Sequence, residues 1–312
     1  MPVLKSLLMS LSRNARLRRV LETSRLGRRL SSRFVAGTRL DEALAAVAAV
    51  NAQGMLATLD HLGENVESRE QAEAAAASAA ASLNAIAERG LQCNLSLKLT
   101  QLGLDLSEDL AASLLLQVAS VASRHSNGVR VDMESSAYTE ATLRMVERVH
   151  AMSLPVGAVL QASLYRSAAD RQRLREQGIT VRLVKGAYLE PASLAWPRKE
   201  DVDASFDKLA EQMLRPDGCL PDGPLRNALA THDRERLMRA QRFAAGMGVR
   251  PQQFEFQMLY GIRRDLQREL LKAGWQVRIY IPYGTEWFPY FMRRLAERPA
   301  NLVFLLRNVL AA

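Results

Sequence analysis

Short apolar runs alternate with longer segments of helical periodicity, and this pattern constrains the fold more than any other feature of the chain. After Gly37, eight runs have the length and composition of strands: Met55–Leu59, Asn94–Leu97, Val129–Asp132, Val156–Leu160, Val181–Lys185, Asn227–Ala230, Phe254–Leu259 and Val277–Ile281. Eight strand–helix units in roughly 250 residues predict an α/β protein with a closed (β/α)8 barrel. An open doubly wound sheet is the alternative, but no Gly-x-Gly-x-x-Gly turn opens the first unit.

Helix-period segments separate these runs. We expect helices over Glu73–Glu88, Glu108–Ser123, Thr139–Met152, Ala168–Gln177, Ala204–Leu214, Arg234–Met247 and Asp265–Ala273. The connection after the fifth run is longer than the others and extends through residues 187–226. Long loops at a barrel mouth often cover the site below them, so this connection is a candidate lid.

The N-terminal segment differs from the rest of the chain in charge. Residues 1–35 contain nine Lys or Arg and one Glu, so they carry +8 of the net charge of +9. Leucines at helical spacing precede the arginines, which predicts a basic amphipathic helical arm at residues 1–36 and a barrel domain at residues 37–312. Such an arm could pack on the barrel, lie on an anionic membrane surface or direct the chain to an organelle. The nearly neutral barrel gives no reason to expect a nucleic-acid partner.

Polar residues follow or interrupt most of the apolar runs. The carboxyl ends of barrel strands meet at one face, where the active sites of such proteins form. Burial of Lys98, Arg182 and Lys185 near this face would be costly unless carboxylates or a negative ligand neutralised them. A ligand that carries a pyrophosphate has the required charge.

Two other kinds of enzyme site find less support. A zinc or iron site would have to use His61, His232 and carboxylates, because the four histidines include no close His-x-His pair. A Ser–His–Asp hydrolase would need a Gly-x-Ser-x-Gly turn, which the sequence lacks.

The segment YIPYGTEWFPYFMRRLAE near the C-terminus predicts a site for a small anion. Arg293 and Arg294 are adjacent, and Tyr290 lies one helical turn before Arg293. Residues three apart share a helix face, and a guanidinium can bind a carboxylate through two parallel hydrogen bonds. A solvated basic helix face is the alternative for this arginine pair.

Nine blocks of sequence together resemble a known family. They are RFVAGTRLDEAL, TLDHLGENV, SLKLTQLG, VRVDMESSAYTEAT, VLQASLYRSAAD, VRLVKGAYLEP, ATHDRERL, EFQMLYGIR and YIPYGTEWFPYFMRRLAERPAN. From about Arg33 to the C-terminus, the chain resembles the proline dehydrogenase family, in particular its short monofunctional bacterial form. The resemblance implies a distorted (β/α)8 barrel that binds FAD noncovalently. It also implies oxidation of L-proline to Δ1-pyrroline-5-carboxylate, with electrons passed to a membrane quinone.

The resemblance also implies roles for individual residues. An arginine pair holds the substrate carboxylate in this family, which corresponds to Arg293 and Arg294. Glu64 matches a gate that pairs with the first of these arginines. The other positions implied to line the substrate pocket are Lys98, Asp132, Leu259, Tyr280 and Tyr290. The positions implied to contact the flavin are Gln161, Arg182, Val184, Lys185, Gly186, Thr231, His232 and Glu255. Lys98 and Arg182 are the implied catalytic residues, with Lys98 orienting the substrate and Arg182 stabilising charge on the reduced flavin.

Some alternatives stay open from the sequence. Tyr290 favours proline over hydroxyproline, because an aromatic ring close to the substrate leaves little room for a 4-hydroxyl group. FMN is an alternative to FAD, and a peripheral membrane protein that acts through its arm is the alternative outside enzymology. We expect a bacterial cytoplasmic protein with peripheral contact to the inner membrane, and a mitochondrial location is the minor alternative. The product of proline oxidation would pass to a downstream pyrroline-5-carboxylate dehydrogenase.

Overall fold

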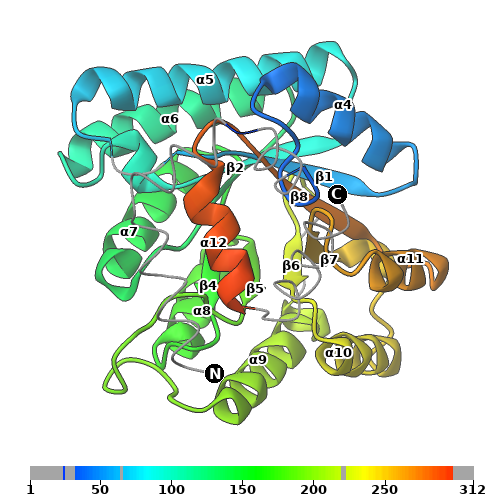
Figure 1. Cartoon of the computed structure of the whole chain (residues 1–312). Coiled ribbons are helices and arrows are strands. Elements are labelled where there is room, and N and C mark those ends of the chain that lie inside the picture. The colour runs from blue at the N-terminus through cyan, green and yellow to red at the C-terminus, as the bar shows by residue number, and fades with distance from the viewer. Residues whose placement is uncertain (1–23, 25–31, 64–65, 219–222, 298–312) are drawn as a thin grey trace.

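Eight parallel strands close into a barrel (Figure 1). A computed structural model describes Ser24 and residues 32–63, 66–218 and 223–297, with side chains up to Met292. Each strand pairs with its neighbours in chain order, and β8 closes the barrel by pairing with β1. The strands are β1 (Leu56–His61), β2 (Cys93–Leu97), β3 (Val129–Val131), β4 (Val156–Gln161), β5 (Val181–Val184), β6 (Asn227–Ala230), β7 (Phe254–Leu259) and β8 (Val277–Tyr283). The prediction of a closed (β/α)8 barrel is confirmed.

Helices surround the barrel and follow the strands along the chain (Figure 1). The α-helices are α4 (Leu40–Asn51), α5 (Arg69–Glu88), α6 (Glu108–Arg124), α7 (Thr139–His150), α8 (Ser167–Glu176), α9 (Lys199–Met213), α10 (Arg234–Gly246), α11 (Arg264–Lys272) and α12 (Trp287–Glu297). Short 3-10 turns are η1 (Leu99–Leu102), η2 (Ser136–Tyr138), η3 (Pro216–Gly218) and η4 (Pro251–Gln253). None of the described helices is long and apolar enough to cross a membrane.

Two helices differ most from the sequence-based expectation, and α5 also begins four residues before its predicted start at Glu73. The strand–helix pattern does not predict α4, which precedes β1 and packs on β1 and β8. Glu42 caps its start by accepting hydrogen bonds from the backbone N–H groups of Thr38 and Arg39. Helix α9 begins at Lys199, five residues before the predicted start at Ala204. Acidic residues in the first turn of α9 favour this earlier start, because they interact well with the positive end of the helix dipole.

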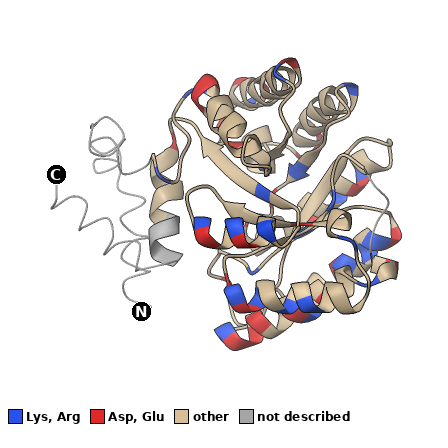
Figure 2. Cartoon of the chain, turned by 90° about the vertical axis from the view of Figure 1, so that its right-hand side faces the viewer, with Lys and Arg blue, Asp and Glu red and all other residues tan. Residues whose placement is uncertain are grey.

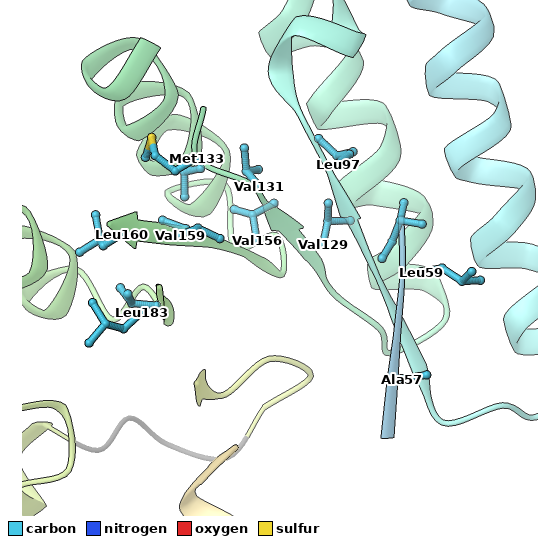
Figure 3. Packing of buried hydrophobic residues seen from close by; sticks show 14 of the residues in the cluster. Ala57, Leu59, Leu97, Val129, Val131, Met133, Val156, Val159, Leu160 and Leu183 are labelled. Atoms are coloured by element: carbon cyan, nitrogen blue, oxygen red, sulfur yellow. The ribbon is translucent and has the colours of Figure 1, made fainter. Parts of the chain in front are cut away.

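The apolar core lies largely between the strands and the outer helices. Figure 3 shows part of it, with side chains such as Leu59, Val131 and Leu183 packed among the elements that surround β1 to β5. These three side chains are fully buried. On the side of the molecule shown in Figure 2, basic and acidic residues lie next to one another on the outer helices, as expected for a solvated outer surface.

The interior of the barrel is polar. Tyr280 on β8 contacts Asp132 after β3, and Arg182 on β5 contacts Ser96 on β2. These bonds join strands that are not neighbours, so they must cross the inside of the barrel. An interior of this kind can present polar groups to a ligand at its mouth.

The last residues of the predicted arm are part of the folded body. Phe34, Val35 and Ala36 are buried, and the backbone N–H of Ala36 donates to the carbonyl of Pro282 at the end of β8. The phenyl ring of Phe34 lies 6.1 Å from that of Phe291 on α12. Apart from Ser24, the arm before Ser32 lies outside the described residues. Its predicted roles stay predictions.

Candidate active site

The site lies at the carboxyl ends of the strands, and Lys98 marks it on the β2 side. Lys98 directly follows β2 and is buried. Its ammonium nitrogen is 3.8 Å from Oδ2 of Asp60, a buried carboxylate in β1. The side chain of Gln101 accepts from the backbone N–H of Lys98 and donates to the carbonyl of His61. This bond ties the turn after β2 to the loop after β1.

A compact cluster next to Lys98 consists of Asp132, Tyr280 and Arg182. The Tyr280 hydroxyl donates to Oδ2 of Asp132 at 2.6 Å, and an Arg182 nitrogen is 3.3 Å from Oδ1 of the same carboxylate. The Arg182 guanidinium also lies over the Tyr280 ring, 5.2 Å from its centre. Burial and then the negative charge of Asp132 raise the pKa of Tyr280 well above its usual value. The phenol therefore stays protonated and acts as a donor.

Ser96 joins two members of this cluster and was not predicted from the sequence. Its hydroxyl lies 2.9 Å from Oδ1 of Asp132 and 3.0 Å from the carbonyl of Arg130, and it accepts a hydrogen bond from Arg182 at 2.9 Å. Ser96 is only 1% exposed. Its position could have been found from strand periodicity, because Ser96 lies two residues before Lys98 and such residues share a strand face.

A second polar cluster lies deeper, near the amino end of β7. Glu255 accepts two hydrogen bonds from Arg278, at 2.6 and 2.8 Å, and a third from Gln257 at 3.0 Å. Burial by itself would raise the pKa of Glu255, but Arg278 lowers it. The carboxylate is therefore ionised and committed to protein partners. A flavin contact for Glu255 stays a prediction, and the structure gives its oxygens these partners.

Gln161, Val184 and Gly186 lie at the carboxyl ends of β4 and β5. Gln161 is buried and donates to the carbonyl of Glu134 at 2.9 Å. Gly186 has a φ of +112°, and a Cβ at this position would lie 2.2 Å from the Ser163 hydroxyl. The chain therefore turns closely over the end of β4 only because residue 186 is glycine.

Lys185, just after β5, is held by two carboxylates. Its ammonium group bonds Asp203 of α9 and also contacts Asp233 at 2.7 Å. Burial would raise the pKa of Asp203, but hydrogen bonds from Lys185 and Lys199 lower it. Burial would also raise the pKa of Asp233, but the hydrogen bond from Lys185 lowers it. The burial of Lys185 is thus balanced by protein groups, without a ligand.

Thr231 and His232 follow β6 and are fixed by backbone groups. The Thr231 hydroxyl accepts from the backbone N–H of Asp233 at 3.2 Å. Nε2 of His232 accepts from the backbone N–H of Leu259 at 2.9 Å. A ring nitrogen that accepts carries no proton, so Nδ1 bears the proton in the neutral ring. This bond links the end of β6 to Leu259 of β7, and Leu259 is one of the predicted substrate contacts.

The structure describes only part of the helix that carries the predicted substrate-binding residues Tyr290, Arg293 and Arg294. Tyr290 is buried on α12, which in both views lies across one end of the barrel (Figures 1 and 2). Because α12 follows β8, this end is the one where the strands finish. Arg293 and Arg294 belong to α12, but their side chains lie outside the described part of the chain. Glu64 also lies outside it, so its role as a gate stays a prediction.

His61 does not face the barrel interior, although it ends β1 next to Asp60. Its Nδ1 is 3.2 Å from the Ser78 hydroxyl on α5, and its ring stacks on Tyr283 with centres 4.8 Å apart. Burial lowers the pKa of His61. Successive residues of a strand point to opposite sides, so Asp60 and His61 cannot both reach the site. The described residues contain no group of three or more His, Cys, Asp or Glu that could hold a metal ion.

Comparisons with known proteins agree with this picture of the barrel. The family model described as "Proline dehydrogenase" matches residues 43–307. Proline dehydrogenase 1 of Bacillus subtilis (strain 168) is 42% identical over 287 residues, which cover 92% of each chain. Proline dehydrogenase of Deinococcus radiodurans is 37% identical over 286 residues, which cover 90% of each chain. Among solved structures, proline utilization A from Bdellovibrio bacteriovorus, inactivated by N-propargylglycine, matches with a TM-score of 0.78. That match has 24% identity and covers 86% of this chain and 32% of the other, so it shows the fold alone.

Proposed function

The chain belongs to the proline dehydrogenase family and is an enzyme of that kind, and from this premise we propose its reaction in detail. It oxidises L-proline to Δ1-pyrroline-5-carboxylate, uses noncovalently bound FAD and passes the electrons to a membrane quinone. The observation that carries the proposal is the cluster of Asp132, Tyr280 and Arg182 beside Lys98, at the end of the barrel where α12 lies.

Proline suits a site of this kind. It is a small zwitterion, so its carboxylate needs cations and its ring needs an enclosed apolar surface. Arg293 and Arg294 are the proposed partners of the carboxylate, and buried Tyr290 provides a ring on the same helix. Fixing both ends of so small a substrate orients the bond to be broken, which converts the reaction into a well-placed unimolecular step.

The residues present fit a flavin. Nε of Arg182 is buried and has no hydrogen-bond partner among the described residues, so an acceptor on a ligand would satisfy it. The further groups proposed to hold the cofactor lie at the carboxyl ends of β4, β5 and β6: Gln161, Val184, Lys185, Gly186, Thr231 and His232. When bound, the flavin supplies the acceptor for the two electrons that proline loses.

The chain itself supplies placement and charge. Arg182 is held by Asp132 and Ser96 in a position where it can stabilise negative charge. Lys98 is held near Asp60 and contributes a positive field rather than a covalent bond. Tyr280 stays protonated because its pKa is raised by burial and by Asp132, so it orients Asp132 rather than taking up a proton. The two electrons and two hydrogens that proline loses would reduce the flavin and then convert the quinone to its quinol.

The remaining parts of the proposal concern partners and location. We place the protein in the bacterial cytoplasm, in peripheral contact with the inner membrane, where a quinone is available. Its product passes to a pyrroline-5-carboxylate dehydrogenase. The basic arm, with +8 of the net charge, supports contact with an anionic surface.

An anaerobic absorption spectrum, recorded before and after addition of L-proline, tests the reaction and the cofactor together. We expect a flavin spectrum that bleaches with L-proline and is unchanged by D-proline. Cofactor released by denaturation should be FAD and not FMN, and a short-chain quinone should restore the oxidised spectrum. Bleaching by 4-hydroxyproline instead of proline would move the substrate, and a colourless protein that does not bind added flavin would overturn the proposal.

A further inference from the structure

An open pocket of about 520 Å³ lies beside the turn that follows β7, and its lining includes none of the predicted substrate or flavin residues. Its lining is Arg33, Gly261, Arg263, Arg264 and Asp265. Three of these five residues are arginines. Since the chain after residue 35 carries a net charge of only +1, this concentration of positive charge is local and does not reflect a basic barrel.

The pocket joins two segments that are far apart in the sequence. A Cβ at Gly261 would lie 1.8 Å from the carbonyl oxygen of Arg33, so only glycine allows the two backbones to approach this closely. Gly261 has a φ of +71°, which glycine adopts without strain. The end of the arm is thereby fixed against the turn between β7 and α11. Arg33 is positioned by backbone packing as well as by its side chain.

Arg263 and Asp265 shape the wall of the pocket on the α11 side. Arg263 has φ 49° and ψ 49°, a left-handed conformation that is costly for a residue with a side chain, and it starts α11 without a capping hydrogen bond from its own side chain. Its guanidinium is paired with Asp265 at 2.7 Å. Asp265 is a carboxylate in the pocket, and it neutralises one of the three arginines.

Arg264 has no ion pair or side-chain hydrogen bond with any residue that the structure describes. Burial and then the nearby positive charge of Arg264 lower the pKa of Arg33, so the two guanidiniums lie close enough to repel each other. Both arginines line the pocket next to the first turn of α11, so its positive charge comes from their guanidiniums.

We propose that Arg33 and Arg264, beside the neutralised Arg263, form a binding site for the phosphate group of an anionic ligand. Guanidiniums bind phosphate oxygens in pairs, and the pocket is large enough for a phosphate and its first substituent. The phosphate is carried either by a phospholipid headgroup or by a small free phosphate. The lipid source deepens the proposed function and rests on it, because it would bring the mouth of the barrel to the membrane that holds the quinone.

The test compares two charge reversals in the full-length flavin-loaded protein. Arg264→Glu removes a pocket arginine, and a glutamate in the first turn of a helix is favourable, so α11 should keep its stability. Arg268→Glu changes the net charge equally on the same helix, outside the pocket lining. Co-sedimentation with phosphatidylcholine vesicles, with and without phosphatidylglycerol, measures lipid binding. The shift of the melting temperature with inorganic phosphate measures binding of free phosphate.

For a lipid ligand, we expect Arg264→Glu to weaken binding to the anionic vesicles by roughly 10-fold or more and Arg268→Glu by about 3-fold or less. For a free phosphate, inorganic phosphate should raise the melting temperature of the wild type and of Arg268→Glu but not of Arg264→Glu. If wild type and Arg264→Glu behave alike in both measurements, the site does not exist and any vesicle binding belongs to the arm. Bleaching by L-proline, recorded on the same samples, reports separately on the proposed reaction.

Discussion

Two sets of buried cations lie inside the same barrel, and they are held differently. In the deep cluster, Arg278 forms two short bonds to Glu255, and Arg130 donates to the carbonyls of Ala158, Thr180 and Arg226. At the mouth, Lys98 is 3.8 Å from Asp60 and Arg182 is 3.3 Å from Asp132. The deep arginines are engaged by protein groups, whereas Arg182 at the mouth keeps one buried donor, its Nε, without a partner in the described part of the chain.

The electrostatics follow the same division. Burial lowers the pKa of Arg130 to about 9, because its partners are carbonyl dipoles with no carboxylate among them. Burial acts on Arg278 as well, but Glu255 outweighs it and raises the pKa of that arginine. At the mouth, Nε of Arg182 is buried without a partner in the described part of the chain. The deep arginines therefore need no ligand, whereas the unpaired Nε of Arg182 can donate a hydrogen bond to one.

The strongest test of this comparison removes the carboxylate of the deep cluster. We expect Glu255→Gln to reduce the free energy of unfolding by about 3–5 kcal/mol, because Arg278 would keep a buried charge without a counterion. Urea unfolding followed by circular dichroism measures the change. Glu269→Gln is the matched control, since it removes an exposed partner of Arg234 and should cost less than about 1 kcal/mol. Equal losses in the two variants would show that the deep cluster is not a stabilising element.

The fold could be predicted from the sequence more completely than the site. The bounds of β6 and β7 agree with the predicted runs to the residue, because both runs are bordered by polar or turn-forming residues. Helix α4 was missed because it precedes the first strand and stands outside the repeating pattern. The alternative of a metal site would have used His61, but the period of a strand places His61 on the side opposite to Asp60.

Other features of the site depend on the tertiary structure. The pairing of Lys185 with Asp203 requires the register of α9 on the barrel, which no local pattern specifies. The bond between Ser96 and Arg182 joins β2 to β5 and follows from closure of the barrel. A sequence identifies which charges must be neutralised, but it does not identify the groups that neutralise them.

At the mouth, substitution of Ser96 removes a hydrogen bond to Arg182 without removing a charge. We expect Ser96→Ala to lower kcat/KM for L-proline by roughly 10- to 100-fold, because Arg182 loses a hydrogen bond to a charged group and Asp132 loses a donor. Ser96→Thr keeps the hydroxyl and should restore most of the activity. Flavin bleaching under anaerobic conditions gives the rate.

Ser82→Ala is the control for Ser96→Ala. Ser82 is also fully buried, and its hydroxyl lies 3.0 Å from that of Tyr283, between β8 and α5. This variant should lose stability without a comparable loss of kcat/KM. A similar fall in kcat/KM for both serine variants would mean that Ser96 affects activity through general packing and not through Arg182.

The smallest expected effect concerns Lys185, which belongs to the mouth but is neutralised by protein groups. The pKa of Asp203 is lowered in the folded protein, so its contribution to stability is present above the pKa of the unfolded chain, near 4, and is lost as the pH falls through the folded value. We expect Asp203→Asn to reduce this loss of stability at acid pH by on the order of 1 kcal/mol or less. Urea unfolding between about pH 3 and pH 7 measures it. If the slope is unchanged in the variant, Lys185 does not depend on Asp203, and its charge would be available to a ligand in the same way as that of Arg182.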